Sequence, residues 1–205
     1  MNLQRPFQVV APTLDGDVLT VLARADRALT GRAIERETGG SHGGVQRALD
    51  HLAAEGIISR ERAGRAYLYR LNRNHLAAPW IEGLATLRLQ LIERLRDSVG
   101  QWEIEPASTV LFGSVARDEA ARASDLDLLI VRPHGIDADD ETWRTQLMAI
   151  QQAVTSWTGN DTRVLEYGEE EISPEEPVLN AAASEGIEIG GSLPRLLERA
   201  RRRCR

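Results

Sequence analysis

The stretch LFGSVARDEAARASDLDLLIV, residues 111–131, holds a glycine–serine pair near its start and two alternating aspartates before an apolar run. Residues two apart in a strand share a face, so Asp125 and Asp127 are expected to project side by side from a strand that ends at Val131. Buried carboxylates need a proton, an arginine partner or a divalent cation to offset lost hydration. Mg²⁺ prefers oxygen ligands and keeps phosphate oxygens in its shell, which suits a nucleotide.

The glycine–serine pair follows an apolar strand predicted at residues 109–112 and opens a short helix that bears Arg117. Glycine lets a ligand approach the backbone closely, and the first N–H groups of a helix bind anions. The hydroxyl of Ser114 adds a further donor. The sequence therefore predicts that a triphosphate lies between Gly113, Ser114 and the two aspartates.

Taken together, the G-S, A-R and S-D-L-D-L elements of residues 111–131 resemble the signature of minimal nucleotidyltransferases in the DNA polymerase beta superfamily. Members of that family move a nucleoside monophosphate from a nucleoside triphosphate to an acceptor hydroxyl and release pyrophosphate. The resemblance implies two Mg²⁺ ions, a nucleoside triphosphate substrate, which we expect to be ATP, and an unknown protein or RNA acceptor. It also implies a small mixed sheet with helices.

Relatives of this kind usually carry a third carboxylate on a neighbouring strand. The candidate is Glu166 in DTRVLEYG, residues 161–168, and Asp161 is the second choice because it precedes the strand. By this resemblance the catalytic and metal-binding residues are Asp125, Asp127 and Glu166. The implied nucleotide-binding residues are Gly113, Ser114, Arg117 and Ser124. Taken singly, these residues also fit structural roles: Gly113 and Ser114 can start a helix, and Asp127 can pair with Arg117 or Arg132.

The first third of the chain has a different pattern, three helices followed by two short strands. Thr30 and Ser41 are suited to cap the second and third helices, and Gly56 follows the third. The segment GGSHGGVQRALDHLAAEGIISRERAGRAYLYRLN, residues 39–72, resembles winged helix-turn-helix domains. This resemblance implies binding to double-stranded DNA, with a protein-interaction or dimerisation module as the alternative. The implied DNA-contacting residues are Ser41, His42, Gln46, Arg47, Arg60, Arg62 and Arg65.

The predicted organisation is α+β with two domains. A winged helix-turn-helix domain spans residues 1–73, a linker helix spans 74–102, an α/β nucleotidyltransferase domain spans 103–192, and a basic C-terminal helix or tail spans 193–205. Apolar residues in the linker recur every three or four positions, typical of an amphipathic helix. That helix is expected to pack on a domain, or alternatively to form a homodimer seam.

The composition and charge of the chain exclude several kinds of chemistry. The net charge is −6, but residues 1–100 carry 14 Arg against 11 acidic residues, whereas residues 101–205 carry 11 Arg against 20. All 25 basic residues are arginine, which excludes lysine-dependent chemistry, and the single cysteine, Cys204, excludes a disulfide framework. We expect a cytoplasmic protein without a membrane segment or signal peptide.

Two further functions stay open at this point. One is a DNA-binding transcriptional regulator that senses a nucleotide without turnover. The other is a toxin–antitoxin component, which is implied only by the resemblance to the minimal nucleotidyltransferases. The intact G-S and D-L-D elements favour the enzyme.

Overall fold

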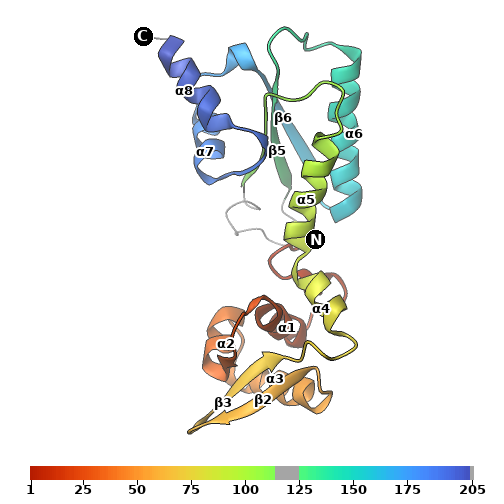
Figure 1. Ribbon diagram of the computed structural model, residues 1–205, viewed down its shortest axis with the longest axis vertical. Helices are drawn as coiled ribbons and strands as arrows, with labels where there is room; N and C mark the ends of the chain where they lie inside the picture. Colours follow the sequence, from red (N-terminus) through yellow and green to blue (C-terminus); the bar gives the residue numbers. More distant parts are fainter. Residues whose placement is uncertain (114–124, 204–205) are drawn as a thin grey trace. The chain divides into compact units, whose positions relative to one another are not determined.

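A computed structural model describes residues 1–113 and 125–203 of the 205-residue chain (Figure 1). The chain divides into two compact units, residues 2–88 and residues 89–205. Each has its own apolar core, as two small domains require. No helix in the described part of the chain is both long and apolar enough to cross a membrane.

Three α-helices and a three-stranded antiparallel sheet of order β1-β3-β2 form most of the first unit. Its elements are η1 (Pro6–Val9), α1 (Leu14–Arg24), β1 (Leu29–Thr30), α2 (Gly31–Thr38), α3 (His42–Ala54), β2 (Ile58–Ala63) and β3 (Ala66–Leu71). The hydroxyl of Thr30 accepts from Ala33 N–H (3.3 Å) and that of Ser41 accepts from Gly44 N–H (3.3 Å), so the predicted caps begin α2 and α3. The order of helices and the β2–β3 ribbon is that of a winged helix.

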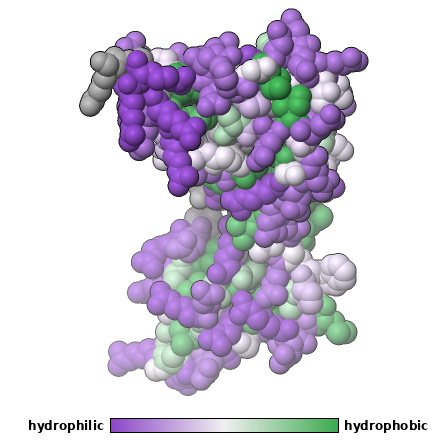
Figure 2. Space-filling view, turned by 45° about the horizontal axis from the view of Figure 1, so that its top comes forward, coloured by the Kyte–Doolittle hydropathy of each residue, from purple (hydrophilic) through white to green (hydrophobic). Residues whose placement is uncertain are grey.

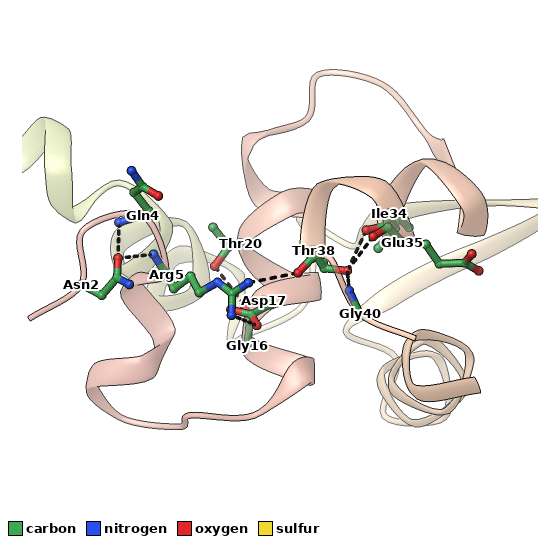
Figure 3. A network of polar contacts seen from close by, with 10 residues as sticks. All are labelled: Asn2, Gln4, Arg5, Gly16, Asp17, Thr20, Ile34, Glu35, Thr38 and Gly40. Carbon is green, nitrogen blue, oxygen red and sulfur yellow. Dashed lines mark hydrogen bonds and ion pairs between the residues drawn. The ribbon is translucent and has the colours of Figure 1, made fainter. Parts of the chain in front are cut away.

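Polar contacts tie the start of the chain to α1 and α2 (Figure 3). The side-chain oxygen of Asn2 accepts from Arg5 N–H (3.1 Å), and the Arg5 guanidinium donates to the Thr38 carbonyl (3.2 Å) and pairs with Asp17 at 3.5 Å. Burial raises the pKa of Asp17, and the nearby Arg5 opposes that shift. The N-terminal segment is thereby fixed against the helix-turn-helix.

The predicted linker helix is corrected: residues 74–102 form two helices, α4 (Ala78–Ala85) and α5 (Leu87–Val99). Thr86 separates them with φ −102° and ψ 12°, and its hydroxyl donates to the Glu82 carbonyl at 2.9 Å. A β-branched residue that bonds back onto the preceding turn ends a helix readily. Helix α4 belongs to the first unit, where Ile81 and Ala85 join the core, and α5 lies almost wholly in the second unit.

The second unit is built on a four-stranded sheet of order β6-β5-β4-β7. Strands β5 and β6 are parallel, and the other neighbouring pairs are antiparallel, so the predicted mixed sheet and α+β class are confirmed. Its elements are β4 (Ser108–Phe112), β5 (Leu126–Arg132), α6 (Glu141–Thr158), β6 (Thr162–Gly168), η3 (Glu169–Glu171), α7 (Pro177–Glu185), β7 (Ile187–Gly191) and α8 (Leu193–Arg203).

The helices of this unit lie on both faces of the sheet, with α6 on one face and α7 and α8 on the other (Figure 1). Leu129 and Val131 of β5 pack into the cluster that contains Leu179 of α7 and Leu196 of α8. The residues of β5 that alternate with Leu129 and Val131 face α6, whose Trp143 is fully buried. The outer side of α8, with Arg201–Arg203, is exposed, and hydrophilic residues dominate the surface in Figure 2.

Candidate functional site

The two aspartates lie where β5 begins. Asp125 directly precedes the strand, and Asp127 is its second residue. In the sheet register Asp127 lies between Phe112, the last residue of β4, and Arg163, the second residue of β6. Alternation places the two aspartates on the same face as Leu129, as the spacing predicts. The two carboxylates therefore lie together at the N-terminal end of β5, on the face of the sheet that packs against α7 and α8.

Gly113, which follows β4, lies against Asp127. It has φ +77°, in the left-handed region, and a Cβ atom placed on it would lie 2.5 Å from Asp127 Oδ2. A side chain at this position is therefore disfavoured by the backbone conformation and would displace the Asp127 carboxylate. This close approach brings the turn after β4 and the Asp127 carboxylate into one small site.

Arg163 is a member of this site that the sequence analysis missed. Its guanidinium Nη2 lies 2.6 Å from Asp125 Oδ2, while 74% of the arginine side chain is exposed. The register of the two parallel strands reveals it: β5 begins at residue 126 and β6 at residue 162, so the second residues of both strands are neighbours and point to the same face. A cation therefore stands on β6 beside the paired aspartates.

The environment of the Asp127 carboxylate changes its pKa. Burial raises the pKa of Asp127, the Arg163 guanidinium opposes that shift, and the Asp125 charge adds to it. The ionised form of Asp127 is thus disfavoured by its burial in the folded protein.

Glu166, the predicted third carboxylate, lies elsewhere, and that prediction is corrected. It is the register partner of Ile130, so it faces the side of the sheet opposite Asp127. Its carboxylate pairs with the buried guanidinium of Arg132 and accepts from Trp143 Nε1–H at 2.8 Å. These contacts make it part of the packing beneath α6 and keep it from the Asp125–Asp127 site.

The second choice, Asp161, precedes β6, and its carbonyl accepts from Leu126 N–H at 2.8 Å. Its side chain is exposed, and within residues 1–113 and 125–203 no three His, Cys, Asp or Glu side chains are grouped closely enough to hold a metal ion. Ser114, Arg117 and Ser124 lie outside the described residues. The donors that remain, two carboxylates, fit one Mg²⁺ ion that completes its shell with water and phosphate oxygens.

The predicted DNA-contacting residues form two groups in the first unit. On α3, the His42 ring nitrogen Nδ1 contacts Glu35 at 2.5 Å and Gln46 donates to Asp50 at 3.1 Å, whereas Arg47 is exposed. Ser41 is the cap of that helix. The predicted base-reading residues therefore lie on one exposed helix, with Gln46 held by an acidic neighbour.

The second group lies on the β2–β3 ribbon. Arg60 pairs with Asp50 at 3.0 Å and stacks over Tyr67, with its guanidinium carbon 4.8 Å from the ring centroid. Arg62 donates to the Gly64 carbonyl at 3.3 Å and is exposed, as is Arg65. These two arginines flank the tip of the ribbon, where guanidinium groups are suited to contact phosphates.

Comparison with protein families defines the two domains. Residues 12–66 match the MarR family, and residues 90–178 match the nucleotidyltransferase domain family. The chain therefore carries a MarR-family winged helix domain followed by a nucleotidyltransferase domain, and the predicted identity and order of the two domains are confirmed.

Two solved structures show weaker likeness. A toxin–antitoxin crystal structure with AMP-PNP is 16% identical, with a TM-score of 0.38, over 58% of this chain and 85% of that chain. Human N-acetylserotonin methyltransferase in complex with SAM is 18% identical, with a TM-score of 0.29, over 45% of this chain and 31% of that chain. Both TM-scores are too low to bear on fold or function. A comparison with curated proteins gives no match.

Proposed function

We propose that the chain is a Mg²⁺-dependent nucleotidyltransferase that its winged helix brings to DNA. The observation that carries the proposal is the placement of Asp125 and Asp127 at the start of β5, with Asp127 directly against the side-chain-free backbone of Gly113. A phosphate chain can approach that turn closely, and the carboxylates attract the cation that accompanies it. The nucleotidyltransferase domain that contains these residues supports the transferase class.

The proposed reaction forms one bond and breaks one bond at the α-phosphorus of a nucleoside triphosphate. The oxygen of an acceptor hydroxyl bonds to that phosphorus, the bond to the bridging oxygen of the β-phosphate breaks, and pyrophosphate leaves with the bond electrons while the hydroxyl proton passes to solvent. A bound Mg²⁺ ion neutralises charge on the phosphate oxygens. Asp125 and Asp127 would hold that ion, and the Gly113 turn would seat the phosphates.

Labelling tests this proposal directly. We expect purified protein, incubated with α-labelled nucleoside triphosphates and Mg²⁺ in cell lysate, to move label into protein or RNA. Replacing Asp125 and Asp127 together with Asn should reduce label by roughly 100-fold or more, since metal stabilisation contributes several kcal/mol. Thermal stability should not fall, because burial disfavours the charge of Asp127.

The matched control replaces two exposed carboxylates of the same unit, Asp139→Asn with Glu175→Gln, and should label like the wild type. Label that survives in the Asp125 and Asp127 variant would refute the site. Label confined to one fraction identifies the acceptor as protein or RNA.

The winged helix is proposed to bind double-stranded DNA through Arg62 and Arg65. Replacing both with Ala should weaken binding across sequences and reduce the slope of log affinity against log salt by roughly 2, since each phosphate contact releases counterions. Fluorescence anisotropy with random-sequence duplexes over a salt series measures this slope. Arg73→Ala is the control, because Arg73 pairs with Glu82 at 2.7 Å. An unchanged slope in the double variant would exclude phosphate contacts by this ribbon.

A second candidate function is a nucleotide-sensing DNA-binding regulator without turnover. The observation that favours it is the ion pair between Arg163 and Asp125, because this pair neutralises one of the two carboxylates that a cation would need. Absence of label together with calorimetric binding of a nucleoside triphosphate would support the regulator over the enzyme.

A further inference from the structure

Arg163 changes the charge balance of the proposed nucleotide site. Its Cα is in register with Asp127 on the adjacent parallel strand, and its guanidinium lies 2.6 Å from an oxygen of Asp125. Two carboxylates and one guanidinium leave a formal charge of −1. That charge attracts one divalent cation, but a second would have to approach a permanently charged guanidinium at a few ångströms, where like charges repel strongly.

The donor count leads to the same limit. In the described ranges 1–113 and 125–203, Asp125 and Asp127 are not joined by a third ligating side chain. Glu166, on the same strand as Arg163, faces the other side of the sheet and is held by Arg132 and Trp143. The residue of β6 that faces the site is therefore Arg163, a cation. A second metal ion would need a ligand at this position.

We propose that Arg163 is a nucleotide-binding residue that takes the place of a second metal ion, so that the site holds a triphosphate with a single divalent cation. The guanidinium is planar, permanently charged and able to bind two phosphate oxygens at once. Its side chain is 74% exposed, so it can turn from Asp125 to an arriving phosphate without leaving a packed position. This inference rests on the proposed nucleotide site and deepens it.

Binding measurements test the proposal without relying on transfer. The probes are the α,β-methylene analogues of ATP, GTP, CTP and UTP, which present the phosphates but resist cleavage at the α-phosphorus. We expect Arg163→Ala to weaken the affinity of the preferred analogue by about 10- to 100-fold, as expected for a lost charged hydrogen bond. Arg163→Lys should lie between this variant and the wild type, because it keeps the charge but loses the paired donors. Arg144→Ala, an exposed arginine on α6, is the matched control.

Counting bound Mn²⁺ by electron paramagnetic resonance supplies an independent readout. With the analogue present, the wild type should hold one Mn²⁺ per chain, and Arg163→Asp should hold two. Two ions in the wild type, or an Arg163→Ala variant that binds the analogue as tightly as the wild type, would overturn the role of Arg163 while leaving the nucleotide site intact. A wild type that binds none of the analogues would overturn both this inference and the proposed function.

Discussion

Replacing Gly113 with Ala is expected to weaken nucleotide binding while leaving the protein folded. The added Cβ atom would lie 2.5 Å from Asp127 Oδ2, far inside van der Waals contact. That oxygen is the end of a side chain, so rotation of Asp127 relieves the clash at modest energetic expense. The rotation moves the carboxylate away from Asp125 and from the turn at Gly113 where the phosphates are proposed to bind. The affinity for the nucleotide should therefore fall by at least about 10-fold, the effect of losing one charged contact.

Gly135→Ala is a control that separates the effect of backbone strain from the effect of displacing the Asp127 side chain. Gly135 lies in the same unit with φ +85°, and a Cβ atom there would have no atom within 4 Å. Both variants must place alanine in the left-handed region, which costs about 1–2 kcal/mol each. Chemical unfolding should therefore show similar losses of stability, whereas calorimetry should show a reduced nucleotide affinity only for Gly113→Ala. Equal nucleotide affinities in the two variants would mean that contact with Gly113 does not position Asp127.

Local sequence patterns predicted the parts of this site that depend on a single strand or turn. The alternation of Asp125 and Asp127 fixes their common face once β5 is recognised, and Gly113 follows the apolar run that forms β4. The caps at Thr30 and Ser41 likewise predicted the starts of α2 and α3. Each of these predictions uses information within a few residues of the position concerned.

The missed features depend on how separate segments pair. Whether Glu166 or Arg163 faces the aspartates is decided by the register of β6 against β5, and a shift of one residue exchanges the two faces. The break at Thr86 depends on a side chain that bonds back to Glu82, within an apolar pattern that continues through both helices. Periodicity alone contains neither register nor local hydrogen bonding.

Replacing Glu166 with Ala should destabilise the second unit and leave the nucleotide site functional. Arg132 is only 6% exposed, and its guanidinium would lose its carboxylate partner while keeping its bond to the Ile136 carbonyl at 2.9 Å. Trp143 would lose the acceptor of its indole N–H. Breaking a buried ion pair by removing one member typically costs about 3–5 kcal/mol, because the remaining charge stays buried without compensation.

Urea unfolding followed by circular dichroism measures this loss, and calorimetry at low temperature measures nucleotide affinity on the same samples. Glu170→Ala is the matched control, because Glu170 is half exposed and contacts His134 at the long distance of 3.7 Å, so its removal should cost less than about 1 kcal/mol. Replacing both members of the buried pair, Arg132→Met with Glu166→Leu, should recover much of the lost stability, since it leaves no charge in the core. A Glu166→Ala variant with wild-type stability and lost nucleotide binding would instead return Glu166 to the site, against the strand register that places it beneath α6.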